Sequence, residues 1–185
     1  MSNQKQLRVV FMGTPDFSVP TLEALIKAGH SIVGVYCQPD KQKGRGKQVQ
    51  MPPVKVAALN HNLPVFQPVT LRDEQVQAEL EALNPDVVVV IAYGKILPPW
   101  LIHLPQYGCI NVHASILPKY RGAAPIHYAI LNGDTKTGVT IMHMDDGLDT
   151  GDIIDIVETD ILCGETTGQL FERMALLGGK TIVPV

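Results

Sequence analysis

The sequence predicts an α/β fold with a doubly wound, mostly parallel sheet and helices on both faces. Residues 7–13, 19–29 and 31–37 form an apolar run, an amphipathic segment and a second apolar run, which is the pattern of a strand–helix–strand crossover. The run PDVVVVIAYG at 85–94 is apolar without alternation, as in a central parallel strand covered on both faces. Hydrophobic residues make up 45% and charged residues 18% of the 185 residues, so the chain belongs to the globular class and not to the disordered one.

The elements follow from periodicity and from the positions of glycine and proline. Leu22, Leu25 and Ile26 form the apolar stripe of the first helix, which has Pro20 near its start and Gly29 at its end. Residues 38–53 have no periodicity, so we expect a loop that is functional or mobile. The other expected elements are helices at 53–61, 73–83, 124–133 and 166–179 and strands at 64–68, 108–114, 137–144 and 151–158.

Composition excludes several classes of protein. The net charge of −3 gives the protein no overall positive potential that would attract nucleic acid, so a nucleic-acid partner would need a local basic patch. Cys37, Cys109 and Cys163 are far apart and form no C-x-x-C pair, which favours a reduced, cytoplasmic protein over a disulfide scaffold or a zinc site. The segment MSNQKQLRVVFMG lacks the long apolar core that we expect of a signal peptide, and no apolar run reaches about 18 residues. The apolar ending KTIVPV predicts that the chain stops inside its next element.

An unusual polar face lies on the strand expected at 108–114. Side chains alternate between the two faces of a strand, so Asn111, His113 and Ser115 share one face. A strand covered by helices should be apolar on both faces, and ligands in open α/β folds bind near the carboxyl ends of strands. A single histidine is more often a satisfied core residue, but three alternating polar residues favour a site.

A second candidate is the acidic turn MDDGLDTGD at 144–152, with four aspartates. It is open to three interpretations: a solvated turn, a calcium loop, or an aspartate that orients and charges His113. The spacing of a calcium loop is absent. We expect the turn at the carboxyl edge of the sheet, beside Asn111. The sequence also lacks the motifs of a dinucleotide site, a phosphate loop and a serine nucleophile. It lacks the histidine motifs of a zinc site as well, so we expect no metal.

Two long segments resemble the folate-dependent formyltransferases. NVHASILPKYRG is similar to their N-x-H…S-L-L-P-x-x-x-G segment, and GVTIMHMDDGLDTGDI contains their D-x-G-x-D-x-G signature. FMGTPDFSVPTLEALI and the GRGK loop narrow the resemblance to members that formylate methionyl-initiator tRNA. It covers essentially the whole chain and departs at Ile116, where leucine is usual. The resemblance implies a Rossmann-like catalytic domain at 1–185, truncated at its C-terminal end and without the β-barrel domain of those members.

The resemblance implies acyl transfer from 10-formyltetrahydrofolate to the α-amino group of the methionyl-tRNA. Asn111, His113 and Asp149 would be the catalytic trio, with His113 between the other two. Asn111 and protonated His113 would donate hydrogen bonds to the tetrahedral oxyanion. Asp149 would hold the imidazolium and help to take the proton of the amine. Neither a metal nor a covalent enzyme intermediate is required.

The resemblance also assigns binding residues. The folate would lie along the turn formed by Ser115, Ile116, Leu117 and Pro118. Its pterin would lie against the backbone around Lys95, Ile96 and Leu97 and against the acidic turn with Asp145 and Gly147. Phe17 would form a wall of the methionine pocket. The tRNA acceptor end would meet Lys41, Lys43, Arg45 and Lys47; without the resemblance these cations would indicate only a solvated loop.

Two alternatives remain open. One is a formyltransferase on the same fold that acts on a nucleotide-sugar amine or glycinamide ribonucleotide, or that hydrolyses formyl-folate. The other is a non-catalytic folate- or RNA-binding module. The GRGK and GTPDFSVP segments argue against the first, and the complete trio argues against the second. We expect a monomeric protein.

Overall fold

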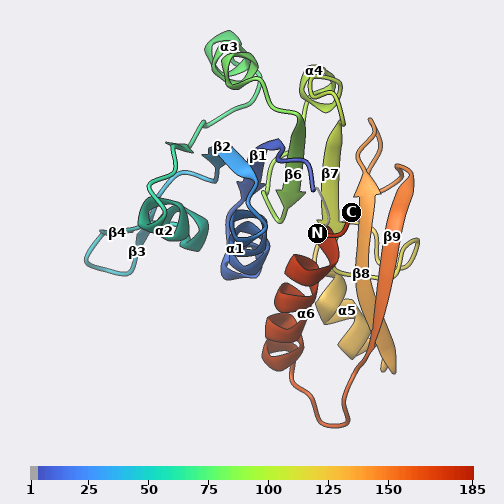
Figure 1. The fold of residues 1–185 in the computed structure, drawn as a ribbon. Coiled ribbons are helices and arrows are strands. Elements are labelled where there is room, and N and C mark those ends of the chain that lie inside the picture. The colour runs from blue at the N-terminus through green and yellow to red at the C-terminus, as the bar shows by residue number, and fades with distance from the viewer. Residues whose placement is uncertain (1–3) are drawn as a thin grey trace.

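The computed structural model describes residues 4–185, which fold around one seven-stranded sheet (Figure 1). The strand order is β5-β2-β1-β6-β7-β8-β9. Five strands run parallel, and β8 runs antiparallel to both of its neighbours. The strands are β1 (Arg8–Gly13), β2 (Ser31–Tyr36), β5 (Val65–Phe66), β6 (Val87–Ile91), β7 (Cys109–His113), β8 (Lys136–His143) and β9 (Ile153–Asp160). The predicted mostly parallel sheet is therefore confirmed.

Helices cover both faces of the sheet, and the alternation of strand side chains separates two apolar cores. Phe11 points to the core that includes Leu22, whereas Met12 points to the core that includes Leu80. The first face carries α1 (Val19–Lys27), α2 (Pro53–Asn60), α5 (Pro125–Leu131) and α6 (Thr167–Ile182). The second face carries α3 (Glu74–Leu83) and the short α4 (Pro99–Ile102), which was not predicted. A 3-10 turn, η1 (Asp16–Ser18), precedes α1.

The C-terminal helix is longer than expected. The sequence predicts its end at the pair Gly178 and Gly179, but α6 continues to Ile182. The two glycines instead allow a close approach to α1, since a Cβ on Gly179 would lie 2.8 Å from the Pro20 carbonyl oxygen. The first three residues of the ending KTIVPV therefore lie in the last turn of α6, and a turn follows at 183–184.

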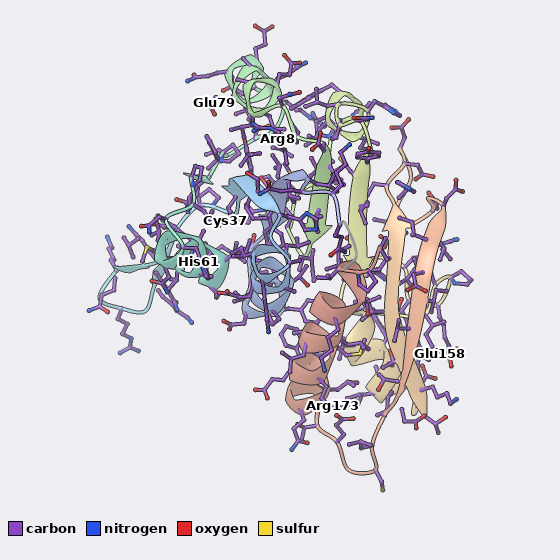
Figure 2. All side chains as sticks on the ribbon, viewed as in Figure 1. Arg8, Cys37, His61, Glu79, Glu158 and Arg173 are labelled. Carbon is purple, nitrogen blue, oxygen red and sulfur yellow. The ribbon has the colours of Figure 1, made fainter. Side chains whose placement is uncertain are left out.

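Arg173 on α6, labelled in Figure 2, connects this helix to the preceding strand β9 by hydrogen bonds. Arg173 Nε donates to Glu165 at 2.6 Å, and its two terminal nitrogens donate to Thr159 Oγ1 at 3.0 Å and to the Asp160 carbonyl at 2.7 Å. The bonds to Arg173 and to the Leu162 N–H lower the pKa of Glu165. These hydrogen bonds fix the segment that leads from the edge strand β9 into α6.

The expected loop at 38–53 is in part a β-hairpin, which corrects the prediction. β3 (Lys41–Lys43) pairs antiparallel with β4 (Gln48–Gln50), and the hairpin projects beyond α2 (Figure 1). Every residue of both strands is exposed. Without a buried face, the sequence carries no apolar alternation that would indicate strands.

In the described part of the chain, no helix is long and apolar enough to cross a membrane.

Candidate active site

A cavity of about 690 Å³ opens beside β6 and β7. Its walls come from residues 92–97 after β6, from 111–114 on and directly after β7, from 122–127 before and within α5, and from the acidic turn at 144–149. Phe17 and Phe171 close it on the helical side. The cavity is within the range usual for small-molecule sites, and it lies near the strand ends where α/β folds bind ligands.

The expected trio meets in this cavity, with Asp149 in the middle. Asp149 Oδ1 accepts a hydrogen bond from Asn111 Nδ2 at 3.3 Å, and Asp149 Oδ2 lies 3.7 Å from His113 Nδ1. The side chains of His113 and Asp149 are only 8% and 9% exposed. The expected order, with His113 between Asn111 and Asp149, is therefore wrong, because the carboxylate reaches between the amide and the imidazole.

The acidic turn reaches Asn111 by an unexpected route. β8 runs antiparallel to β7, so His143 pairs with Ile110 near the start of β7. The Met144 N–H then donates to the Cys109 carbonyl at 2.8 Å. The turn therefore does not begin at the carboxyl edge of the sheet, as predicted, but crosses back along β7 until Asp149 meets Asn111.

The segment after Pro118 holds both acid–base groups of the cluster. The Gly122 N–H donates to Asp149 Oδ2 at 2.7 Å, and Arg121 Nε donates to the Asp149 carbonyl at 3.1 Å. His113 Nε2 lies 2.9 Å from the Tyr120 carbonyl. A carbonyl can only accept, so Nε2 carries a hydrogen, and Nδ1 is the nitrogen that faces Asp149.

This arrangement leaves two groups available for a ligand. Asn111 uses one amide N–H for Asp149, and its second N–H can donate to a developing oxyanion. His113 can hold a proton on Nδ1, which makes the ring an imidazolium beside a carboxylate. The cluster therefore combines hydrogen-bond donation with proton transfer at one point of the cavity.

Ser115, the third residue of the polar alternation, is not part of the cluster. Its Oγ donates to the Lys119 carbonyl at 2.6 Å, and its own carbonyl accepts from Thr140 Oγ1 at 2.6 Å. It is fully buried and closes the turn before Tyr120. Neither Ser115 nor the neighbouring residues Ile116, Leu117 and Pro118 line the cavity.

The other residues expected to bind folate do line the cavity. These are Lys95, Ile96, Leu97, Asp145 and Gly147. Lys95 Nζ donates to the Val69 carbonyl at 2.7 Å. Residues 95–97 also border a second cavity of about 440 Å³, which continues to residues 69–72.

Internal hydrogen bonds shape the acidic turn. Asp145 Oδ1 accepts from Thr150 Oγ1 at 2.7 Å and from the Gly147 N–H at 2.9 Å. These two bonds, the Thr150 bond first, hold the pKa of Asp145 below its usual value. A Cβ on Gly147 would collide with the Thr150 hydroxyl, so a side chain there would displace this hydroxyl from Asp145.

The remaining expected residues lie in two places. Phe17 lines the cavity, is 5% exposed and packs on Phe171 with ring centroids 4.9 Å apart. The expected tRNA cations are all exposed, on the strands of the hairpin or in its turn, and none lines the cavity: Lys41, Lys43, Arg45 and Lys47.

Several lining residues were missed by sequence reasoning. Tyr93 follows β6 and is buried, which raises its pKa, and its carbonyl accepts from Thr14 Oγ1 at 2.9 Å. The Tyr93–Gly94 pair at the end of a buried apolar run was the available signal, because strand ends of this kind border ligands. His127 and Phe171 lie on helices, where nothing in the pattern sets them apart.

Side chains of the types that bind metals do not cluster in the described part of the chain. Within residues 4–185, no three histidine, cysteine, aspartate or glutamate side chains are close enough together to hold an ion.

The sheet and its partly buried Asn111–Asp149–His113 cluster define an α/β protein with a site suited to group transfer. The family model described as formyl transferase matches residues 7–185, and the chain belongs to this family. It is 56% identical over 176 residues to a methionyl-tRNA formyltransferase of Alkaliphilus oremlandii, covering 95% of this chain and 57% of that protein. A methionyl-tRNA formyltransferase of Clostridioides difficile is 52% identical over 176 residues, with the same coverage. The chain thus spans less than two thirds of these curated relatives.

Solved structures share the fold. A phosphoribosylglycinamide formyltransferase from Bacillus halodurans matches with a TM-score of 0.77 and 23% identity, covering 95% of this chain and 91% of the other. A formyltetrahydrofolate deformylase from Pseudomonas syringae matches with a TM-score of 0.74 and 25% identity, covering 96% and 59%. At this identity the Bacillus protein shows the fold alone, and the activity must be argued from the site.

Proposed function

We propose that this chain transfers the formyl group of 10-formyltetrahydrofolate to the α-amino group of methionyl-initiator tRNA. The observation that carries the proposal is the Asn111–Asp149–His113 cluster inside a cavity of a formyl transferase domain, where Asp149 accepts one hydrogen bond of 3.3 Å from Asn111 and lies 3.7 Å from His113 Nδ1. Relatives 52–56% identical that are called methionyl-tRNA formyltransferases support this acceptor.

The reaction proceeds by direct acyl transfer. The amine nitrogen attacks the formyl carbon, a C–N bond forms, and the carbonyl oxygen becomes an oxyanion. Asn111 and protonated His113 donate to this oxygen, and loss of one such donor typically costs about 10²–10³ in rate. Asp149 stabilises the imidazolium and receives the amine proton through one water. The bond to N10 then breaks, N10 takes the proton that the amine gave up, and tetrahydrofolate and formylmethionyl-tRNA leave.

The co-substrate would occupy the larger cavity. Its pterin would lie against the backbone of Lys95, Ile96 and Leu97 and against the acidic turn at Asp145 and Gly147. The turn at 115–118 lies outside the cavity lining, so we restrict its role to holding the segment that follows. The adjoining cavity, with Arg72 and Lys95 in its wall, offers room for the anionic tail of the co-substrate.

The acceptor would approach from the hairpin side. Lys41 and Lys43 are two residues apart on β3 and therefore share one face, whereas Arg45 and Lys47 lie in the connecting turn. Such a local basic surface is needed because the chain as a whole is acidic. Phe17 would contact the methionine side chain. We further propose that the protein acts as a monomer in the cytoplasm.

The test is formyl transfer from 10-formyltetrahydrofolate to three acceptors: methionyl-initiator tRNA, glycinamide ribonucleotide and water. We expect product only with the tRNA. Formylation of the small amine, or release of formate, would favour the first alternative. Binding of the folate without turnover on any acceptor would favour the non-catalytic one.

A further inference from the structure

Tyr120 lies beside His113 in a backbone conformation that tyrosine seldom adopts. Its φ is +60°, in the left-handed region where a side chain is strained. In this conformation its carbonyl accepts the hydrogen of His113 Nε2 at 2.9 Å. Strain of this kind persists only where the surroundings enforce it, and it gathers at functional sites.

The surroundings that enforce it meet the phenol end of Tyr120. Its hydroxyl donates to Asp134 Oδ2 at 2.6 Å and accepts from Asn132 Nδ2 at 2.9 Å. Lys119 Nζ donates to the other oxygen of Asp134 at 2.9 Å. Both ends of Tyr120 are thus bound, the carbonyl by His113 and the hydroxyl by residues that follow α5.

Asp134 is a strong acceptor for this anchor. The hydrogen bonds from Tyr120 and then from Lys119 hold its pKa below the usual value, so it is a carboxylate at neutral pH. Hydrogen bonds to a charged acceptor are shorter and stronger than those between neutral groups. The side chain is only 16% exposed, so water competes weakly for these oxygens.

The backbone on either side of Tyr120 is also fixed by hydrogen bonds. The Lys119 carbonyl accepts from Ser115 Oγ at 2.6 Å, and the Gly122 N–H donates to Asp149 Oδ2 at 2.7 Å. The position of the Tyr120 carbonyl is therefore set from three sides, by Ser115, by Asp134 and by Asp149.

We propose that Tyr120 is a positioning residue for His113. Its anchored carbonyl fixes the ring with a hydrogen on Nε2 and presents Nδ1 to Asp149 and the cavity. The hydrogen bond on one ring nitrogen determines the state of the other, so the anchor at Asp134 and Asn132 selects the tautomer of the neutral ring and leaves Nδ1 as the nitrogen at which the working imidazolium gains and donates its proton. The catalytic consequence rests on the proposed function, whereas the tautomer is a property of the protein alone.

The test compares Tyr120→Phe with Tyr128→Phe. Both variants lose one hydroxyl and keep the ring. Tyr128 stacks on Tyr120 with centroids 6.1 Å apart, is half exposed and does not line the cavity, so it is the matched control. The first readout is the long-range ¹H–¹⁵N spectrum of ¹⁵N-histidine protein, with His113 assigned by its loss in His113→Gln. The second is the pair kcat and KM for formyl transfer, measured with the thermal midpoint.

We expect Tyr120→Phe to give a mixture of His113 tautomers and to lower kcat about tenfold, with KM for the folate unchanged. Tyr128→Phe should match the parent in every readout. Asp134→Asn, which keeps an acceptor for the hydroxyl, should retain more activity than Asp134→Ala.

The positioning role is overturned if Tyr120→Phe keeps the parent spectrum and kcat. It is also overturned if kcat falls only together with the midpoint and with binding of the folate, because that pattern is general destabilisation. If the parent transfers no formyl group to any acceptor, the proposed function has failed. The His113 spectrum then decides the inference by itself: a mixture in Tyr120→Phe supports it, and an unchanged spectrum overturns it.

Discussion

The backbone N–H of Gly122 donates a 2.7 Å hydrogen bond to the carboxylate of Asp149, 27 residues further along the chain. The bond joins two positions in the left-handed region, since φ is +87° at Gly122 and +52° at Asp149. It connects the segment that binds His113 through Tyr120 to the acidic turn that contributes the carboxylate. The relative position of the imidazole and the carboxylate therefore depends on a few backbone contacts and not on side-chain packing alone.

Replacing Gly122 with alanine should reduce both stability and turnover. The new Cβ would meet Leu148 Cδ2 at 3.7 Å, an ordinary contact, so the penalty comes from the positive φ and is about 1–2 kcal/mol. Gly29→Ala is the matched control, with φ +88° and no atom within 4 Å. Urea unfolding should give similar losses for the two variants, while formyl transfer should fall only for Gly122→Ala. Equal turnover in both variants would show that the Gly122 bond does not hold the site.

Asp149→Asn should lower turnover by orders of magnitude and leave folate affinity nearly intact. The amide keeps one acceptor oxygen, but it places an NH₂ group where the carboxylate now accepts from Gly122 or Asn111. It also removes the charge that stabilises an imidazolium on His113. Asp152→Asn, in the same acidic turn but outside the cavity lining, is the control. Single-turnover formyl transfer and equilibrium folate binding measure the two effects, and near-normal transfer would remove Asp149 from the mechanism.

Asp145 should make the acidic turn sensitive to low pH. Hydrogen bonds from Thr150 and Gly147 lower the pKa of Asp145 in the folded protein, so the carboxylate form is favoured by folding. The stabilisation is complete above the unfolded pKa of about 3.9 and is lost as the pH falls through the lower folded value. Between about pH 5 and pH 2, the free energy of unfolding should fall less in Asp145→Asn than in the parent, and Thr150→Val should be intermediate. Identical pH profiles for all three proteins would contradict this account.

The fold was largely predictable because its central strands are buried on both faces. The run at Val87–Ile91 is wholly buried, and a segment of this kind has few alternatives to a central parallel strand. The polar residues Asn111 and His113 stood out for the same reason, since they interrupt an otherwise apolar environment. Burial thus made both the strand and the site visible in the sequence.

The rest of the site depends on contacts that leave no pattern in the sequence. The hairpin strands β3 and β4 have no buried face, so nothing in their residues alternates. The positive φ of Tyr120 is imposed by the tertiary structure, because tyrosine has no intrinsic preference for it. Ser115 carries the right chemistry in the right alternation, but its hydroxyl is used by Lys119. Only the distances separate a polar residue that closes a turn from one that faces a ligand.

Arg45 should contribute to tRNA binding through phosphate contacts. It lies in the turn of the exposed hairpin between Gly44 and Gly46, and a Cβ added to either glycine would meet no atom within 4 Å, so the turn has open space around it. Each phosphate neutralised contributes about −0.7 to −0.9 to the slope of log affinity against log salt. All four hairpin cations together would give a slope of about −3 to −4.

Arg45→Ala should therefore make the slope less negative by the contribution of one phosphate, about 0.7 to 0.9, and leave folate binding unchanged. Arg45→Lys keeps the charge and should keep the slope, but it should lose some affinity because lysine cannot fork onto a phosphate or stack on a base. Lys27→Ala, an exposed cation at the end of α1, controls for general charge. The measurement is equilibrium binding of initiator tRNA across a salt series. If Arg45→Ala has the slope and affinity of the parent, the hairpin is a solvated projection and the acceptor is recognised elsewhere on the protein.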